Sequence, residues 1–235
     1  MIRILCSGLL FDMDGILVDS TPAVARVWKA WADEHGFDPA RVVKHAHDRP
    51  SLISIQELLP QASPEAHLAE DLRMQRAEID DVADVVALPG AAQLLSQVPP
   101  DRFAVVTSAV RELAEVRLRA AGILPLVRHM VTASEIQRGK PDPEPYLKGA
   151  AALGLPPANC IVIEDAPSGV RSGKAAGCRV LAIRTTIHDP ELFASGADWI
   201  VNDCASIRLV APPSLRELAI ELADDARNPR IPQMS

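Results

Sequence analysis

Short apolar runs recur along the chain, and each ends abruptly in polar residues or in Gly and Pro. The first falls within residues 2–11, and runs of the same kind occupy 103–106, 160–163, 180–183 and 199–201. Runs of this length, rich in branched side chains, predict strands buried on both faces of a parallel sheet. Between them lie helical patterns, at 90–97, 111–121, 144–153 and 168–176. Strand and helix therefore alternate from residue 86 to 205, which predicts a doubly wound α/β domain with a parallel sheet.

The segment from residue 20 to 85 breaks this alternation. Helical patterns cover 23–35, 52–59 and 63–79, with no convincing strand among them. Ser20-Thr21-Pro22 is typical of a helix start, and Gly36 follows the end of the same helix. We expect an all-helical domain inserted at 19–85, a core domain formed by 1–18 and 86–220, and a C-terminal tail at 221–235.

The composition narrows the class of protein. With 235 residues, 48% of them hydrophobic and 23% charged, the chain can form one core domain with an insertion. Its net charge of −7 argues against the broad basic face that nucleic acid or an anionic membrane would require. The absence of a long apolar run and the acidic N-terminal stretch argue against a membrane span and a signal peptide. The four cysteines form no CxxC pair and are interpreted as free thiols, so we expect a cytoplasmic protein, and a monomer.

Polar side chains that suit catalysis follow the ends of the predicted strands, where ligands bind in open α/β sheets. Asp12 and Asp14 come directly after the first apolar run. Since residues i and i+2 of an extended segment point the same way, the two carboxylates should converge while Met13 turns toward the core. Two close carboxylates repel each other unless a cation or proton lies between them, and Mg²⁺ suits such a site. The alternative is a chance Asp-x-Asp on a surface loop.

The second predicted strand is followed by Thr107, Ser108 and Ala109, ahead of a predicted helix. Hydroxyls and free backbone N–H groups at a helix start can hold an anion such as phosphate. Taken alone, the same pattern is also typical of a simple helix N-cap.

Two further clusters complete the set. Lys140 lies in a loop that Pro141 and Pro143 stiffen, so its ammonium group would be delivered from a stiff loop, although a lone lysine in a loop is more often simply solvated. Glu164 and Asp165 end the strand at 160–163 and precede a helix, whose dipole alone could explain acidic residues there.

In this order, the segments FDMDGILVDS, VVTSA, GKPDPEPYL and VIEDAPSGV resemble the four motifs of the haloacid dehalogenase superfamily, the aspartate-nucleophile phosphohydrolases. The resemblance covers roughly residues 8–185. It implies a Rossmann-like α/β core with an inserted helical cap, and a phosphatase that hydrolyses phosphomonoesters. One departure is Ile16, where the family usually has Thr, which puts turnover rather than reaction type in question.

The resemblance also implies roles for the residues above. Asp12 would be the nucleophile that forms an aspartyl-phosphate, and Asp14 the general acid and base. Thr107 and the N–H groups of Ser108 and Ala109 would bind the phosphoryl oxygens, and Lys140 would neutralise the developing charge.

Mg²⁺ is the cofactor that the resemblance implies. Its expected ligands are the Asp12 carboxylate, the backbone carbonyl of Asp14 and the Asp165 carboxylate. Glu164 would lie beside these ligands or act as an occasional ligand.

The expected partner is a small phosphorylated metabolite, because the helical insertion resembles the small cap that selects the leaving group. The chain is most similar to sugar and polyol phosphatases, such as the glycerol-3-phosphatase and 2-deoxyglucose-6-phosphatase group. His47 and Arg49 are expected to contact the leaving group, although Asp48 stands where those relatives carry Gly. A β-phosphoglucomutase-like phosphotransferase, a phosphoglycolate-type phosphatase and a non-catalytic sugar-phosphate-binding protein are alternatives.

Overall fold

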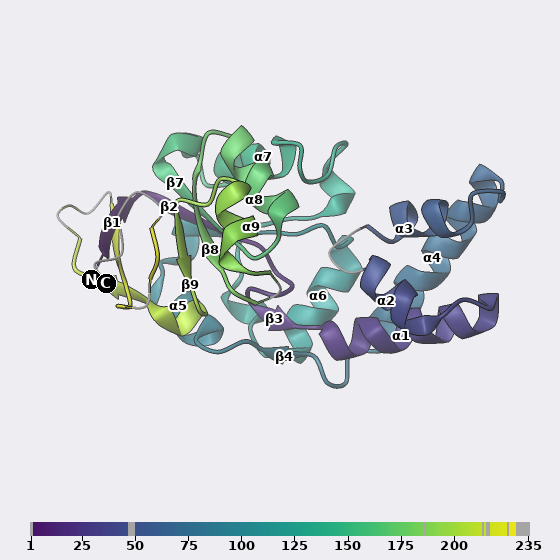
Figure 1. Ribbon diagram of the computed structural model, residues 1–235. Helices are drawn as coiled ribbons and strands as arrows, with labels where there is room; N and C mark the ends of the chain where they lie inside the picture. Colours follow the sequence, from purple (N-terminus) through teal and green to yellow (C-terminus); the bar gives the residue numbers. More distant parts are fainter. Residues whose placement is uncertain are drawn as a thin grey trace.

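The computed structural model describes residues 2–46, 50–185, 187–212, 214, 217–224 and 226–228 (Figure 1). Within these residues the central sheet has six parallel strands, in the order β6 (Met130–Val131), β5 (Phe103–Val106), β2 (Gly8–Phe11), β7 (Cys160–Glu164), β8 (Arg179–Ile183) and β9 (Trp199–Val201). The order reverses at β2, which starts the sheet near its middle, so ligands are expected at the carboxyl ends of β2, β5 and β7. The predicted α/β fold is confirmed.

Alternate residues of each central strand enter different hydrophobic cores, because successive side chains point to opposite faces of a sheet. In β2, for example, Leu9 and Phe11 belong to one core and Leu10 to the other. The first core is covered by α5 (Ala91–Gln97) and α6 (Arg111–Ala120). The second is covered by α7 (Glu144–Ala152), α8 (Pro167–Ala175) and α9 (Asp189–Ala194). Burial on both faces explains why these strands have continuous apolar runs instead of alternating ones.

The expected helical insertion is present, and we call it the cap. It consists of α1 (Thr21–His35), α2 (Pro39–Ala46), α3 (Ser51–Leu58) and α4 (Pro64–Asp80). Trp28 and Trp31 are buried in a separate hydrophobic core that these helices share. The chain enters and leaves the cap through β3 (Val18–Asp19) and β4 (Val86–Ala87), which pair antiparallel. In Figure 1 the cap lies at one end of the molecule and β1 at the other, with the six-stranded sheet between them.

A second sheet was not predicted. The apolar run at 2–11 is split, so that β1 (Ile2–Cys6) leaves the parallel sheet and pairs antiparallel with β11 (Leu218–Leu222), which also pairs with β10 (Ile207–Val210). The expectation of a tail from residue 221 is wrong at its start, since Glu221 and Leu222 belong to β11 and Arg227 bridges to Ile200. These strands are short and only partly apolar, so their pairing depends on distant partners rather than on local pattern.

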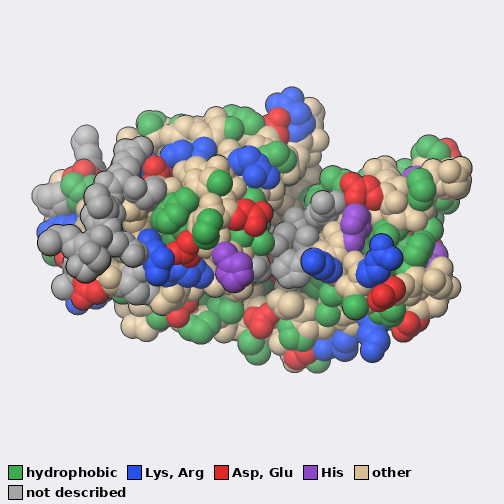
Figure 2. All heavy atoms as spheres, in the orientation of Figure 1, with side chains coloured by type: hydrophobic (Ala, Val, Ile, Leu, Met, Phe, Trp, Pro, Cys, Tyr) green, Lys and Arg blue, Asp and Glu red, His purple; other side chains and the backbone are tan. Residues whose placement is uncertain are grey.

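The surface of the described residues is mixed in character. On the face drawn in Figure 2, basic and acidic side chains are interspersed over both the core and the cap. No helix of the described part of the chain is long and apolar enough to span a membrane.

Candidate active site

The loop after β2 places two acidic side chains at the carboxyl edge of the sheet. The Asp12 amide donates to the Ile163 carbonyl across the strand pair at 2.9 Å, which fixes the start of the loop. Asp12 and Asp14 both line a pocket, whereas Met13 is fully buried in the core between them. The alternation predicted from the sequence therefore holds at this loop.

Lys140 lies against the Asp12 carboxylate. Its Nζ donates to Asp12 Oδ1 at 2.5 Å, to Glu164 Oε1 at 2.7 Å and to the Val106 carbonyl at 3.2 Å. These three acceptors come from the ends of β2, β7 and β5, so one ammonium group joins three strands. The ammonium also lies 5.1 Å from the centre of the Tyr146 ring. Lys140 is buried and fully hydrogen-bonded, and not a solvated loop lysine.

The electrostatics of this cluster follow from burial and a surplus of negative charge. Burial raises the pKa of Asp12 to about 7, although the Lys140 charge opposes the shift. Burial alone would lower the pKa of Lys140, but the charges of Asp12 and Glu164 outweigh it and hold that pKa above its ordinary value. The lysine therefore stays cationic, and the acidic groups around it attract further positive charge.

Glu164 and Asp165 end β7 in different environments. Glu164 Oε1 accepts from Lys140 and from the Tyr146 hydroxyl, the latter at 2.7 Å. Its Oε2 accepts from the amides of Asp165 at 3.0 Å and Ala166 at 3.1 Å. Four protein donors thus hydrogen-bond the Glu164 carboxylate. The Asp165 carboxylate lines the pocket beside it.

The carboxylates of Asp12, Glu164 and Asp165 fit a divalent metal ion. One oxygen from each lies within 4.8 Å of the others, and oxygen donors of this kind are the ligands that Mg²⁺ prefers. Gly15 makes room for the Asp165 carboxylate, since a Cβ there would lie 2.1 Å from Asp165 Oδ2. Gly15 also has a φ of 76°, a conformation that favours glycine.

The residues after β5 form a further part of the sheet edge of the site. Thr107 is buried, and its Oγ1 accepts from the Ala109 amide at 3.1 Å. Ser108 and Ala109 line the pocket beside it. Helix α6 begins only at Arg111, so Thr107 does not act as its N-cap.

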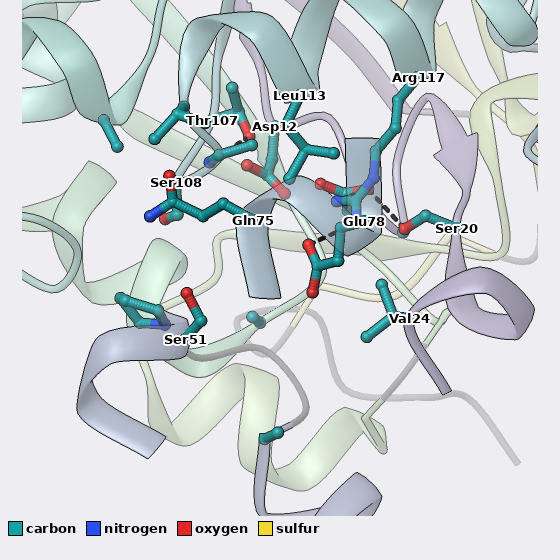
Figure 3. A pocket seen from close by; sticks show the side chains of 18 of the residues that line it. Asp12, Ser20, Val24, Ser51, Gln75, Glu78, Thr107, Ser108, Leu113 and Arg117 are labelled. Carbon is teal, nitrogen blue, oxygen red and sulfur yellow. Dashed lines mark hydrogen bonds and ion pairs between the residues drawn. The ribbon is translucent and has the colours of Figure 1, made fainter. Parts of the chain in front are cut away.

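Asp14 is held by two donors on the side nearer the cap. The Ser20 hydroxyl donates to Asp14 Oδ1 at 2.6 Å, and Arg117 Nη1 donates to the same oxygen at 3.0 Å. The Arg117 Nη2 donates to Glu78 Oε2 at 3.0 Å, and Glu78 belongs to α4 of the cap. Figure 3 shows Arg117 and Glu78 meeting at the edge of the pocket, beside Ser20.

The pocket itself measures about 340 Å³ and lies between the sheet edge and the cap. Three polar residues at helical spacing on α4, Asp71, Gln75 and Glu78, line its cap side together with Ser51 of α3. Ser51 Oγ donates to Asp71 Oδ1, and Gln75 Nε2 donates to Asp71 Oδ2 at 2.8 Å. In Figure 3, the Gln75 side chain extends from the cap toward the place where Ser108 is drawn, and Ser51 lies on the cap side of the view.

Several of these residues were not predicted as part of the site. Tertiary packing alone brings three of these features to the site: the polar face of α4, Arg117 and Tyr146. For Arg117 the sequence did contain a signal, because a charged residue occupies a buried position of the amphipathic helix pattern. The predicted His47 and Arg49, and the departure at Asp48, lie outside the described residues. Ile16, the other departure, is buried in the core.

A parallel sheet in a doubly wound α/β domain, with an acidic carboxyl edge and an inserted helical cap, is the architecture of a capped hydrolase with a Rossmann-like core. The family model for haloacid dehalogenase-like hydrolases matches residues 6–177, and the chain belongs to this family. The resemblance found in the motifs is confirmed.

Individual relatives agree with this assignment. Hexitol phosphatase A of Escherichia coli is 40% identical over 211 residues, covering 89% of this chain and 96% of the relative. Glycerol-1-phosphate phosphohydrolase 2 of Saccharomyces cerevisiae is 34% identical over 217 residues, covering 86% and 84%. The crystal structure of a HAD family hydrolase from Deinococcus radiodurans, with bound phosphate and sodium, superimposes with a TM-score of 0.63 at 28% identity, covering 85% of this chain and 92% of that one. The predicted enzyme class, a phosphatase of this superfamily, is confirmed.

Proposed function

We propose that the protein is a Mg²⁺-dependent phosphatase that hydrolyses monophosphate esters of small polyols or sugars through a phosphorylated Asp12. The observation that carries this proposal is the position of the Asp12 carboxylate. It is buried against Lys140 and faces a pocket whose opposite wall belongs to the cap and combines polar with apolar side chains.

The reaction would proceed in two displacements. The Asp12 carboxylate attacks phosphorus, the bond from phosphorus to the ester oxygen breaks, and Asp14 gives its proton to the departing alkoxide. Asp14 then takes a proton from a water molecule, whose oxygen attacks the phosphorus of the aspartyl-phosphate. Inorganic phosphate leaves, and the Asp12 carboxylate and protonated Asp14 are restored.

The other residues of the sheet edge would bind the phosphoryl group. The Thr107 hydroxyl and the Ser108 amide lie along one wall, the Ala109 amide would exchange its bond to Thr107 Oγ1 for one to the phosphoryl group, and Lys140 provides a fixed positive charge. Because this lysine already has three acceptors around it, its ammonium needs no rearrangement before the reaction.

Asp12, the Asp14 carbonyl and Asp165 would hold Mg²⁺, which supplies neutralisation of the charge shared by the phosphate and its nucleophile. Glu164 would remain beside these ligands, because four protein donors already occupy its oxygens. Its role is then to orient Lys140 and the backbone that carries Asp165.

The pocket favours a neutral, hydroxyl-rich leaving group. Among the described residues that line it, the only cations are Lys140 and Arg117, and both are paired with carboxylates. Asp71, Gln75, Ser51 and Glu78 offer hydrogen bonds to hydroxyls, and the carboxylates of Asp71 and Glu78 repel a second anionic group. A polyol or hexose monophosphate is therefore favoured over phosphoglycolate or a sugar bisphosphate, in keeping with relatives that are named as hexitol and glycerol-1-phosphate phosphatases.

Phosphate release from a panel of esters tests the proposal. The panel contains glycerol phosphates, hexitol and hexose 6-phosphates, 2-deoxyglucose 6-phosphate and phosphoglycolate, each with Mg²⁺ and with excess chelator. We expect Mg²⁺-dependent release, with kcat/KM higher for polyol and hexose esters than for phosphoglycolate. Asp12→Asn should abolish phosphate release. Asp101→Asn, which alters an exposed aspartate of the α/β domain, should leave it unchanged. Full activity of Asp12→Asn would contradict the proposed nucleophile.

The phosphotransferase alternative is examined separately. The enzyme is mixed with β-glucose 1-phosphate and the matching bisphosphate, and the products are resolved. Free phosphate is expected, while conversion to glucose 6-phosphate without phosphate release would show a mutase instead.

A further inference from the structure

Arg117 is a buried cation to which the proposed reaction assigns no role. It belongs to α6 of the core, its side chain is 6% exposed, and its helix lies beside α4 of the cap. One guanidinium nitrogen is 3.0 Å from Asp14 Oδ1, and the other is 3.0 Å from Glu78 Oε2. A single side chain therefore bridges the core, the cap and the loop that carries Asp14.

The bridge is built for these two carboxylates. The planar fork of a guanidinium presents its nitrogens in a fixed geometry, which a lysine at the same place could not reproduce. Glu78 is mostly buried, and burial raises the pKa of its carboxyl while the Arg117 charge opposes that shift. The remaining nitrogen, Arg117 Nε, is buried and makes no hydrogen bond to the described residues.

The contacts on Asp14 are directional. Both Arg117 and Ser20 donate to Oδ1, so this oxygen acts only as an acceptor. No described residue donates to Oδ2 through a hydrogen bond, and a proton on Asp14 is therefore directed to Oδ2. Two donors on one oxygen also fix the rotation of the carboxyl group about its axis.

We propose that Arg117 is a positioning residue that orients Asp14 for proton transfer and makes this orientation depend on the cap through Glu78. The inference rests on the proposed function, in which Asp14 protonates the leaving oxygen. Arg117 need not touch the phosphoryl group. When α4 is in place, Glu78 and Asp14 together hold the guanidinium; when Glu78 is lost, the guanidinium keeps one partner and Asp14 gains rotational freedom.

The choice of leaving group separates this role from a merely structural one. An alkoxide needs a proton as it departs, whereas p-nitrophenolate leaves without one. The measurement is kcat/KM for the best polyol phosphate and for p-nitrophenyl phosphate, with Mg²⁺, in wild type, Arg117→Gln, Arg117→Lys and Glu78→Ala. For Arg117→Gln we expect a loss of about 100-fold with the polyol ester and of no more than about threefold with p-nitrophenyl phosphate, the size of a general-acid contribution.

The other variants keep the inference testable even if Arg117→Gln folds poorly. Arg117→Lys retains the charge without the fork and should show the same split between the two substrates at smaller size. Glu78→Ala should show it too, because only the cap end of the bridge is removed. Arg119→Gln, which alters an exposed arginine of the same helix, should leave both activities at wild-type values.

The outcomes are distinct. Equal losses with both substrates, or no loss with the polyol ester, would overturn the positioning role while leaving the proposed function intact. A wild-type enzyme that hydrolyses p-nitrophenyl phosphate but no alkyl phosphate would overturn the proposed function, and the role of Arg117 with it.

Discussion

The two walls of the pocket are built in different ways. The sheet-edge wall carries its functional groups on short loops directly after β2, β5 and β7, and Lys140 joins the ends of all three strands through hydrogen bonds. The cap wall carries Asp71, Gln75 and Glu78 on one face of a long helix, α4, and Ser51 of α3 lies beside Asp71 on the same wall. The first wall is held by backbone pairing across a parallel sheet, the second by the packing of side chains between helices.

This difference separates chemistry from selection. The sheet edge contains the proposed nucleophile, the carboxylates proposed to bind the metal and a fixed cation, which any phosphomonoester would use in the same way. The cap wall contains hydrogen-bonding groups without a free cation among its described residues, and it can distinguish leaving groups only. Changes at Asp12, Lys140 or the metal-binding carboxylates should therefore affect every substrate equally, and changes at the cap wall should affect substrates unequally.

The largest effect is expected at Lys140. In Lys140→Gln the buried carboxylates of Asp12 and Glu164 lose their shared ammonium. Turnover of alkyl and aryl phosphates should fall together by about 10³-fold, and the free energy of unfolding should drop by about 3 kcal/mol, because a buried ion pair is broken on one side. Steady-state phosphate release and urea unfolding measure the two effects. Lys148→Gln, at an exposed lysine of α7, is the control, and an unequal loss between the substrates would contradict the role of a common sheet edge.

Gly15→Ala should have the next largest effect. The new Cβ would lie 2.1 Å from Asp165 Oδ2, so a metal-binding carboxylate must move. The positive φ adds strain of about 1 kcal/mol. We expect the Mg²⁺ concentration for half-maximal activity to rise by about 100-fold, as when the support of a metal ligand is lost. Gly122→Ala has nearly the same φ, 73°, with no atom within 4 Å of the added Cβ, and should lose stability without losing metal affinity. Equal metal dependence in both variants would count against Asp165 as a ligand.

The sheet edge could be predicted from the sequence because its information is local. Asp12, Thr107 and Glu164 each follow a continuous apolar run directly or within one position, and parallel strands bring their carboxyl ends to one edge, whereas Lys140 lies in a polar loop and was placed by its motif. The spacing of Asp12 and Asp14 at i and i+2 also predicted that the side chain between them, Met13, enters the hydrophobic core. The four motif segments thus needed only the order of the strands to become one site.

The cap wall and the second sheet could not be predicted in this way. Asp71, Gln75 and Glu78 lie on a helix with many other charged residues, and only its packing against the core decides which face meets the pocket. Arg117 had a detectable anomaly, a charge at a buried helix position, but its partners are 39 and 103 residues away in sequence. β10 and β11 are likewise short strands, and the pairing of β11 with β1 joins opposite ends of the chain.

A smaller and selective effect is expected at Gln75. Its amide hydrogen-bonds Asp71 and lines the cap side of the pocket. Gln75→Ala should lower kcat/KM for the best polyol phosphate about tenfold, the equivalent of one lost hydrogen bond of about 1.4 kcal/mol, with little change for p-nitrophenyl phosphate. Competition between the two esters in one reaction measures the ratio directly. Gln93→Ala on the exposed face of α5 is the matched control, and a parallel loss with both esters would assign Gln75 to stability instead of selection.

The smallest difference concerns the stability of the two regions. The cap core is a small cluster around Trp28 and Trp31, whereas two larger clusters cover the central sheet, and the four cysteines are all buried in these. Burial raises the pKa of every one of these thiols, so they should react with a thiol reagent only when the core opens.

In a Trp199→Phe background, tryptophan fluorescence reports the cap and thiol labelling reports the core. We expect the fluorescence midpoint about 0.5 M urea below the labelling midpoint, because fewer buried side chains stabilise the cap. Loss of the Arg117 bridge in Arg117→Lys should widen the gap, since this bridge joins α4 to the core. Coincident midpoints in both proteins would instead show that the two walls of the pocket unfold as one unit.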